Sequence, residues 1–187
     1  PDLPEVVRIA RDLIRFDTTN WGGGRAAGER EAAEYVGAYL ESLGLQPEYF
    51  EPIPRRTNVM ARVPGRNRDK PALVLHGHLD VVPAMAADWS VDPFAGEIQD
   101  GMLWGRGAVD MKDMDAMILA VLRNFARTGR KPKRYLIFAF FADEEAGGTY
   151  GARYAIEKRP ELFDGATEAI SEVGGFSATI GGQRTYL

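Results

Sequence analysis

The chain is 187 residues long, contains 45% hydrophobic and 27% charged residues, and carries a formal net charge of −4 at pH 7. These values are ordinary for one globular domain, and the mild negative charge gives no electrostatic reason to expect a nucleic-acid or anionic-membrane partner. Because the chain has no cysteine, it has neither disulfides nor thiolate metal sites, and no apolar run approaches the ~20 residues of a membrane helix. We therefore predict a cytoplasmic domain that binds neither nucleic acid nor membrane.

The first half of the chain is predicted to hold two helices, a loop and three strands. Apolar residues recur at helical spacing over residues 3–16 and 29–43, and Gly44 can cap the second helix. Between the two helices, residues 17–28 contain three consecutive glycines and are predicted to form a loop. Short strands are predicted to follow at residues 46–50, 58–63 and 72–75. The last strand is a compact apolar run, which is typical of a strand buried on both faces.

The second half continues the alternation of strands and helices. Asp100-Gly101 is a two-residue turn signal and predicts a hairpin over residues 98–104. Helical periodicity marks residues 112–127 and a shorter segment at residues 150–157. Apolar segments typical of strands lie at residues 134–142, 169–171, 176–180 and 185–187. We predict an α/β fold, a three-layer αβα sandwich around a mixed, largely parallel central sheet.

Polar side chains follow several of these predicted strands at the point where each strand ends. Open α/β sheets place their sites in the loops beyond the carboxyl ends of the strands. Five such side chains follow a strand and one precedes the helix at residues 112–127: His78, Asp80, Glu144, Glu145, Glu172 and Asp110. We expect these six side chains to meet in one pocket at one edge of the sheet.

Several carboxylates in one pocket need compensating positive charge. Two carboxylates ~4 Å apart repel each other by roughly 4 kcal/mol at an effective dielectric constant of 20. Bound divalent cations remove this conflict, and imidazole together with carboxylates suits Zn²⁺ and also Mn²⁺ or Co²⁺. A carboxylate with two oxygens can bridge a pair of such cations. The sequence therefore predicts a metal centre that performs hydrolysis.

The spacing of these residues suggests supporting roles. Asp80 lies two positions after His78, on the same side of an extended segment, so its carboxylate can accept the other imidazole N–H and orient the ring. The adjacent side chains of Glu144 and Glu145 cannot both point the same way. One of the two can bind a cation while the other takes the proton from a metal-activated water, and the spacing alone leaves the assignment open.

The segments HGHLDVVP, DW…DPFAG, DGMLWGRGAVDMKD, ADEEAGGTYGA and SEVGG occur in this order along nearly the whole chain. Together they resemble the co-catalytic zinc hydrolases that include aminoacylase, acetylornithine deacetylase, succinyl-diaminopimelate desuccinylase and glutamate carboxypeptidase. The resemblance implies a hydrolase that cleaves an amide bond of a small peptide or an N-acyl amino acid. It also implies two Zn²⁺ ions in the full-length site, for which Co²⁺ or Mn²⁺ can substitute.

The resemblance further implies a role for each residue of the group. Glu144 acts as the general base, Asp80 orients His78, and the peptide bond that follows Asp110 is cis. The cations are divided among four ligands: His78 and Glu172 on the first, Asp110 on both, and Glu145 on the second.

Two features depart from the family pattern. Asp113 stands where the family commonly has glycine, and the only histidines are His76 and His78, both at the end of one predicted strand. The family takes a further histidine for its second cation from a segment near its C-terminus, and it inserts a lid or dimerisation domain at about the point where this chain stops. We therefore expect residues 1–187 to be the N-terminal portion of a catalytic domain, incomplete as a fold and inactive by itself. The full-length protein is then expected to form a homodimer through the lid.

The alternative is a catalytically silent metal-binding fragment, in which one cation binds and the second is weakly held or absent. The remaining polar residues of these segments have simpler interpretations. His76 is interpreted as a structural residue, and Asp113 and Asp115 as acids in the first turn of a helix, outside the site.

Overall fold

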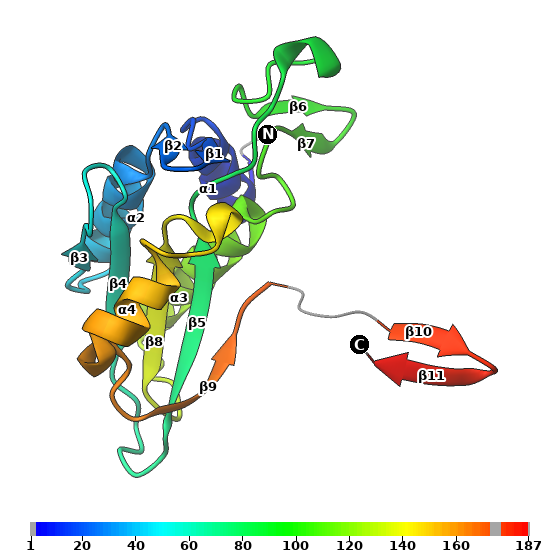
Figure 1. The fold of residues 1–187 in the computed structure, drawn as a ribbon. Helices are drawn as coiled ribbons and strands as arrows, with labels where there is room; N and C mark the ends of the chain where they lie inside the picture. The colour runs from blue at the N-terminus through cyan, green and yellow to red at the C-terminus, as the bar shows by residue number, and fades with distance from the viewer. Residues whose placement is uncertain (1–2, 173–176, 187) are drawn as a thin grey trace.

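Five strands form the central sheet of the chain, whose computed structural model describes residues 3–172 and 177–186 (Figure 1). In spatial order they are β3 (Glu48–Phe50), β4 (Asn58–Val63), β8 (Leu136–Phe141), β5 (Ala72–His78) and β9 (Ala166–Ile170). The central strand of this order, β8, pairs parallel with β5 and antiparallel with β4. Since β5 is parallel to β9, and β3 is antiparallel to β4, four of the five strands run in one direction. The predicted mixed, largely parallel sheet is confirmed.

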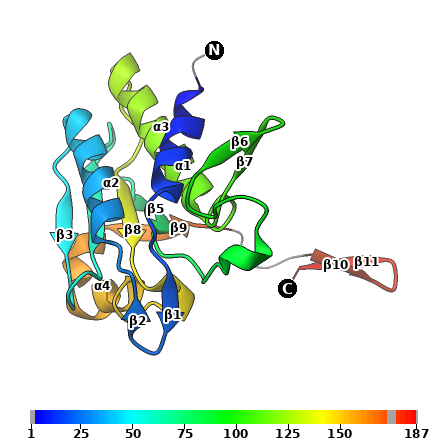
Figure 2. The ribbon, with the colours of Figure 1, turned by 90° about the horizontal axis from the view of Figure 1, so that it is seen from above.

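Helices cover both faces of this sheet (Figures 1 and 2). On one face lie α1 (Glu5–Ile14), α2 (Arg30–Ser42) and α3 (Lys112–Thr128), and on the other lie α4 (Ala152–Lys158) and the 3₁₀ helix η3 (Pro160–Phe163). Each face has its own hydrophobic core. The three-layer αβα sandwich is therefore confirmed.

Strand β8 explains how one short segment supports both cores. All six of its side chains are buried, and alternate residues of a strand point to opposite faces of the sheet. Phe138 and Phe140 pack with the helices α1, α2 and α3, whereas Ile137 and Phe141 pack with α4 and η3. A strand buried on both faces reads as a continuous apolar run, and this is why residues 134–142 gave a strong strand signal.

Most of the predicted elements are present with shifted ends. The hairpin β6 (Glu97–Gln99) and β7 (Met102–Trp104) turns at Asp100-Gly101, where both residues have positive φ, 52° and 78°. Helix α3 ends at Gly129, which adopts the left-handed conformation with φ 64°. The final hairpin consists of β10 (Ser177–Ile180) and β11 (Gln183–Tyr186). Two predicted strand residues, Phe176 and Leu187, lie outside the described residues.

Three predictions need correction. Strand β5 continues to His78, beyond the predicted end, because its last residues pair with β8. Strand β9 begins at Ala166, three residues before its predicted start; it carries exposed polar residues and so lacks a continuous apolar signal. The predicted loop at residues 17–28 contains a hairpin of β1 (Asn20–Gly22) and β2 (Arg25–Ala26). Short 3₁₀ helices complete the elements, η1 (Ala86–Asp88) and η2 (Glu144–Ala146).

No helix within the described ranges has both the length and the apolar character needed to cross a bilayer.

Candidate metal centre

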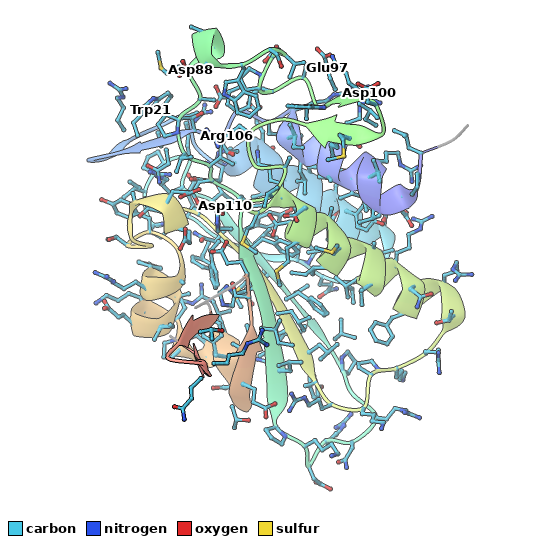
Figure 3. The ribbon with its side chains drawn as sticks, turned by 90° about the vertical axis from the view of Figure 1, so that its right-hand side faces the viewer. Trp21, Asp88, Glu97, Asp100, Arg106 and Asp110 are labelled. Atoms are coloured by element: carbon cyan, nitrogen blue, oxygen red, sulfur yellow. The ribbon has the colours of Figure 1, made fainter. Side chains whose placement is uncertain are left out.

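The predicted site residues lie at the carboxyl end of the sheet. Strands β5, β8 and β9 are parallel neighbours, so their carboxyl ends share one edge. His78 is the last residue of β5, η2 with Glu144 and Glu145 follows β8, and Glu172 follows β9. Asp110 lies at the same end of the sheet, just before α3, as Figure 3 shows. The Asp110-Met111 peptide bond is cis, as the resemblance implied.

Three carboxylates surround the imidazole of His78. Its Nε2 lies 3.0 Å from Oδ1 of Asp110, 3.6 Å from Oε2 of Glu144 and 3.7 Å from Oε1 of Glu172. The histidine side chain is buried, whereas those of Asp110 and Glu144 are 60% and 51% exposed. The imidazole therefore approaches from the protein interior and the carboxylates approach from the solvent side.

The donor set fits a divalent cation. His78, Asp110 and Glu172 each offer one ligand atom, and these atoms all lie within 4.8 Å of one another. Tetrahedral zinc with bonds of ~2.0–2.1 Å would separate its ligand atoms by ~3.3 Å, close to the distances around Nε2. Burial raises the pKa of Glu172, and the neighbouring Asp110 and Glu144 add to the rise, while His78 opposes it. A cation bound here would relieve that repulsion.

Glu145 offers a further ligand atom beside this group. Its Oε1 is buried and has no hydrogen-bond partner among the described residues. Burial, and next the charge of Asp110, raise the pKa of Glu145 to about 7. An unpaired buried carboxylate oxygen is costly, and a cation shared with Asp110 would satisfy it. Glu145 is therefore a candidate ligand for a further cation beside the first.

The backbone fixes the protonation of the His78 ring. Nδ1 lies 2.9 Å from the carbonyl oxygen of Asp80. A carbonyl oxygen can only accept, so Nδ1 carries a proton, and in the neutral ring the lone pair of Nε2 faces Asp110 and Glu172. Burial alone would lower the pKa of His78, but the carboxylates of Asp80 and Asp115 and then Glu144 outweigh it and raise the pKa.

The carboxylate of Asp80 does not make the predicted hydrogen bond to the ring. Its Oδ1 is 3.6 Å from Nδ1 of His78, because both of its oxygens accept hydrogen bonds from other donors. The backbone N–H groups of Glu144 and Glu145 donate to it at 3.0 and 3.1 Å, and Nδ2 of Asn20 donates at 2.8 Å. Asp80 therefore orients the ring through its backbone and holds the two glutamates through its side chain.

Asp115 lies in the first turn of α3, as predicted, but its complete burial was not predicted. It is fully buried, and both of its carboxylate oxygens lack hydrogen-bond partners among the described residues. Burial raises its pKa well above the ordinary value. Its Oδ1 would lie 2.1 Å from a Cβ atom added to Gly77, so the carboxylate packs directly against the strand residue that precedes His78. A glycine inside a strand can signal such a close approach, and Gly77 was the available clue.

Adding a methyl group at Gly77 tests this packing. In Gly77→Ala the new Cβ would meet Oδ1 of Asp115 at 2.1 Å and Cε of Met111 at 3.1 Å. We expect a loss of about 1–3 kcal/mol in the free energy of unfolding, measured by urea denaturation. Combining it with Asp115→Ala should remove most of that cost, because the opposing oxygens are gone. Additive costs in the double mutant would contradict the contact.

His76 stands apart from the ligand atoms. Its Nδ1 lies 3.3 Å from Oγ of Ser171, and its ring packs at 5.7 Å from the ring of Phe141. Burial, and next the charge of His78, lower its pKa. His76 nevertheless lines the same cavity of about 90 Å³ as His78; its other lining residues include Phe141, Glu144, Ser171 and Glu172. The structural role of His76 stays a prediction.

The sequence of the chain is similar to a family model and to proteins of that family. The model of the family described as "Peptidase family M20/M25/M40" matches residues 74–182, more than half of the chain. A succinyl-diaminopimelate desuccinylase of Rhodospirillum centenum is 35% identical over 159 residues, which are 82% of this chain and 39% of that protein. Aminoacylase-1 of Sus scrofa is 36% identical over 130 residues, 67% of this chain and 32% of that protein.

Solved structures show the same fold at lower identity. The M20 family metallo-carboxypeptidase Sso-CP2 from Sulfolobus solfataricus superposes with a TM-score of 0.77 at 22% identity, over 92% of this chain and 38% of that one. Human carnosine dipeptidase 1 superposes with a TM-score of 0.73 at 22% identity, over 92% of this chain and 39% of that one. The chain thus spans about two fifths of the length of the desuccinylase and of these two structures.

Proposed function

The chain belongs to peptidase family M20/M25/M40, and from this premise we propose that the protein hydrolyses an amide bond of a small peptide or an N-acyl amino acid at two divalent cations. One observation carries the proposal. The buried Nε2 of His78 lies 3.0–3.7 Å from oxygens of Asp110, Glu144 and Glu172, at the solvent-facing end of the sheet. The names of the relatives, a desuccinylase and an aminoacylase, support this class of substrate.

In this proposal four residues hold the cations. His78 and Glu172 bind the first, Asp110 binds both, and Glu145 binds the second through its unpaired oxygen. We propose Zn²⁺, with Co²⁺ or Mn²⁺ as substitutes, because the set combines one imidazole with carboxylates. Bound cations supply Lewis acidity, which polarises the amide carbonyl and lowers the pKa of a water molecule toward ~7.

Glu144 serves as the general base. Its side chain is half exposed and stands at the edge of the ligand group, in reach of an attacking water. The carboxylate takes a proton from that water as the oxygen adds to the carbonyl carbon, and it then passes the proton to the leaving nitrogen. Asp80 supports this chemistry by fixing the backbone N–H groups of Glu144 and Glu145 and by holding the ring of His78.

An activity assay tests the proposal. The purified full-length protein is treated with a chelator, dialysed, and assayed against a panel of N-acyl amino acids and dipeptides before and after addition of Zn²⁺, Co²⁺ or Mn²⁺. We expect no hydrolysis without metal and recovery of hydrolysis of at least one class with metal. Activity that survives complete metal removal would contradict the proposal.

A second candidate function follows from the histidine count. The 187 residues contain only two histidines, and neither of them is a proposed ligand of the second cation. The proposed ligands that this chain offers to the second cation are therefore Asp110 and Glu145. The chain by itself would then be a catalytically silent metal-binding module, and groups from outside these residues would complete the second site and bind the substrate. Calorimetric titration with Zn²⁺ separates the two candidates. One tight site supports the silent module, and two tight sites contradict it.

A further inference from the structure

A cluster of buried polar side chains lies behind Glu144 and Glu145. Its members come from five separate segments: β1, the residue before α2, the loop before β4, the loop after β5 and the residue before η2. Each is at most 3% exposed, although polar residues of these types are seldom buried without partners. The cluster consists of Asn20, Glu29, Arg56, Asp80 and Asp143. We call it the buried polar cluster.

Arg56 is the centre of the buried polar cluster. Its Nη1 donates to Oε1 of Glu29 at 2.5 Å, and its Nη2 donates to Oδ1 of Asn20 at 3.0 Å and lies 3.1 Å from Oδ1 of Asp143. Among the described residues, no other lysine or arginine pairs with Glu29, Asp80 or Asp143. One guanidinium therefore pairs with two of the three buried carboxyl groups, Glu29 and Asp143, and its planar fork reaches Asn20 as well.

Asn20 connects Arg56 with Asp80. Its Nδ2 donates to Oδ2 of Asp80 at 2.8 Å and to Oδ1 of Asp143 at 3.2 Å. Its Oδ1 accepts from Arg56 and from the backbone N–H of Gly22. Both ends of the amide are thus used, which fixes the orientation of the side chain between two carboxylates. An aspartate of the same shape would place an acceptor where these carboxylates need a donor.

The two carboxylates held in this way control the segment that carries the glutamates. Asp80 accepts the N–H groups of Glu144 and Glu145 at 3.0 and 3.1 Å. Asp143 begins the segment in the left-handed conformation, with φ 68°, and its Oδ2 accepts the N–H of Tyr150 at 3.1 Å. Residues 143–150 are therefore anchored near their start and at their end by groups that Asn20 and Arg56 hold in place.

We propose that Arg56 and Asn20 are positioning residues, which set the backbone of Glu144 and Glu145 and thereby the direction of both side chains. The catalytic consequence rests on the proposed function, because only there do the two glutamates act as base and ligand. The structural consequence, the order of residues 143–150, does not depend on any activity.

Conservative variants test the proposal in the full-length protein. Arg56→Lys keeps the charge and removes the fork, and Asn20→Asp keeps the shape and removes the donor. The matched control is Arg62→Lys in β4, because the guanidinium of Arg62 donates to the backbone carbonyls of Leu162 and Asp164 and packs over the ring of Tyr135, away from the buried polar cluster. If Arg56→Lys fails to fold, Asn20→Ala carries the test, since it deletes only the amide.

The first measurement is amide hydrogen exchange of the metal-free protein. We expect faster exchange of Glu144, Glu145 and Tyr150 in both variants, with unchanged protection of β4 and α2, and no change in the control. The second measurement is steady-state kinetics of the metal-loaded protein. Mutation of a residue that holds a ligand or catalytic group in place typically lowers activity by ~10–100-fold. We therefore expect a fall of that order in kcat, with KM little changed.

Three outcomes would overturn the proposal. Exchange of residues 143–150 that matches the wild type would show that the cluster does not hold this segment. A uniform loss of protection over the whole sheet would show that the cluster stabilises the fold as a whole and does not specifically position this segment. Faster local exchange with unchanged kcat would show that the placement has no catalytic effect. Faster local exchange in a protein whose wild type hydrolyses nothing supports the positioning of the segment and contradicts the proposed function instead.

Discussion

Replacing His78 by alanine is expected to abolish tight binding of a divalent cation and to reduce hydrolysis to background. His78 supplies the nitrogen at the centre of the ligand group, with oxygens of Asp110 and Glu172 3.0 and 3.7 Å away. Removal of a group that merely orients a metal ligand lowers metal affinity by ~10–100-fold. Removal of the ligand itself should therefore lower the affinity by more than ~100-fold. Calorimetric titration with Zn²⁺ and metal analysis of the purified variant measure the effect.

The matched control is His76→Ala, which changes the only other histidine of the chain. His76 lies on the same strand, contacts Ser171 and Phe141, and is not among the converging ligand atoms. The control should therefore bind Zn²⁺ like the wild type. Equal losses in both variants would contradict the assignment of His78, because they would indicate a general disturbance of β5.

The order of the elements could be predicted because each strand or helix carries its own local signal. The apolar run of β8 and the helical periodicity of α1 and α3 do not depend on distant residues. The β1–β2 hairpin was missed because distant partners hold its ends. The N–H of Asn20 donates to the carbonyl of Val81, a partner that the local sequence cannot reveal.

The candidate site could be predicted in part for a similar reason. Parallel strands bring their carboxyl ends to one edge, so His78 and Glu172 were expected near each other from the order of elements alone. The contacts of Arg56 and Asn20 and the burial of Asp115 were missed, because whether a charged or polar residue is buried depends on neighbours from other segments. No periodicity marks such residues.

Replacing Glu144 by glutamine is expected to lower kcat by ~10²–10⁴-fold, the usual contribution of a general base. The amide has the shape of the carboxylate but cannot take a proton from water at neutral pH. Zn²⁺ affinity should persist, because Glu144 is not among the three residues whose ligand atoms converge within 4.8 Å. Glu157→Gln provides the control, since Glu157 is an exposed acid on α4.

The same titration decides between Glu144 and Glu172, which distance to His78 alone does not separate. Their oxygens lie 3.6 and 3.7 Å from Nε2, so either carboxylate is near enough to share a cation with the imidazole. If Glu144 is the base, Glu144→Gln keeps Zn²⁺ and loses turnover, whereas Glu172→Gln loses both. The opposite pattern would make Glu144 the ligand, and an unchanged kcat in Glu144→Gln would remove it from the chemistry altogether.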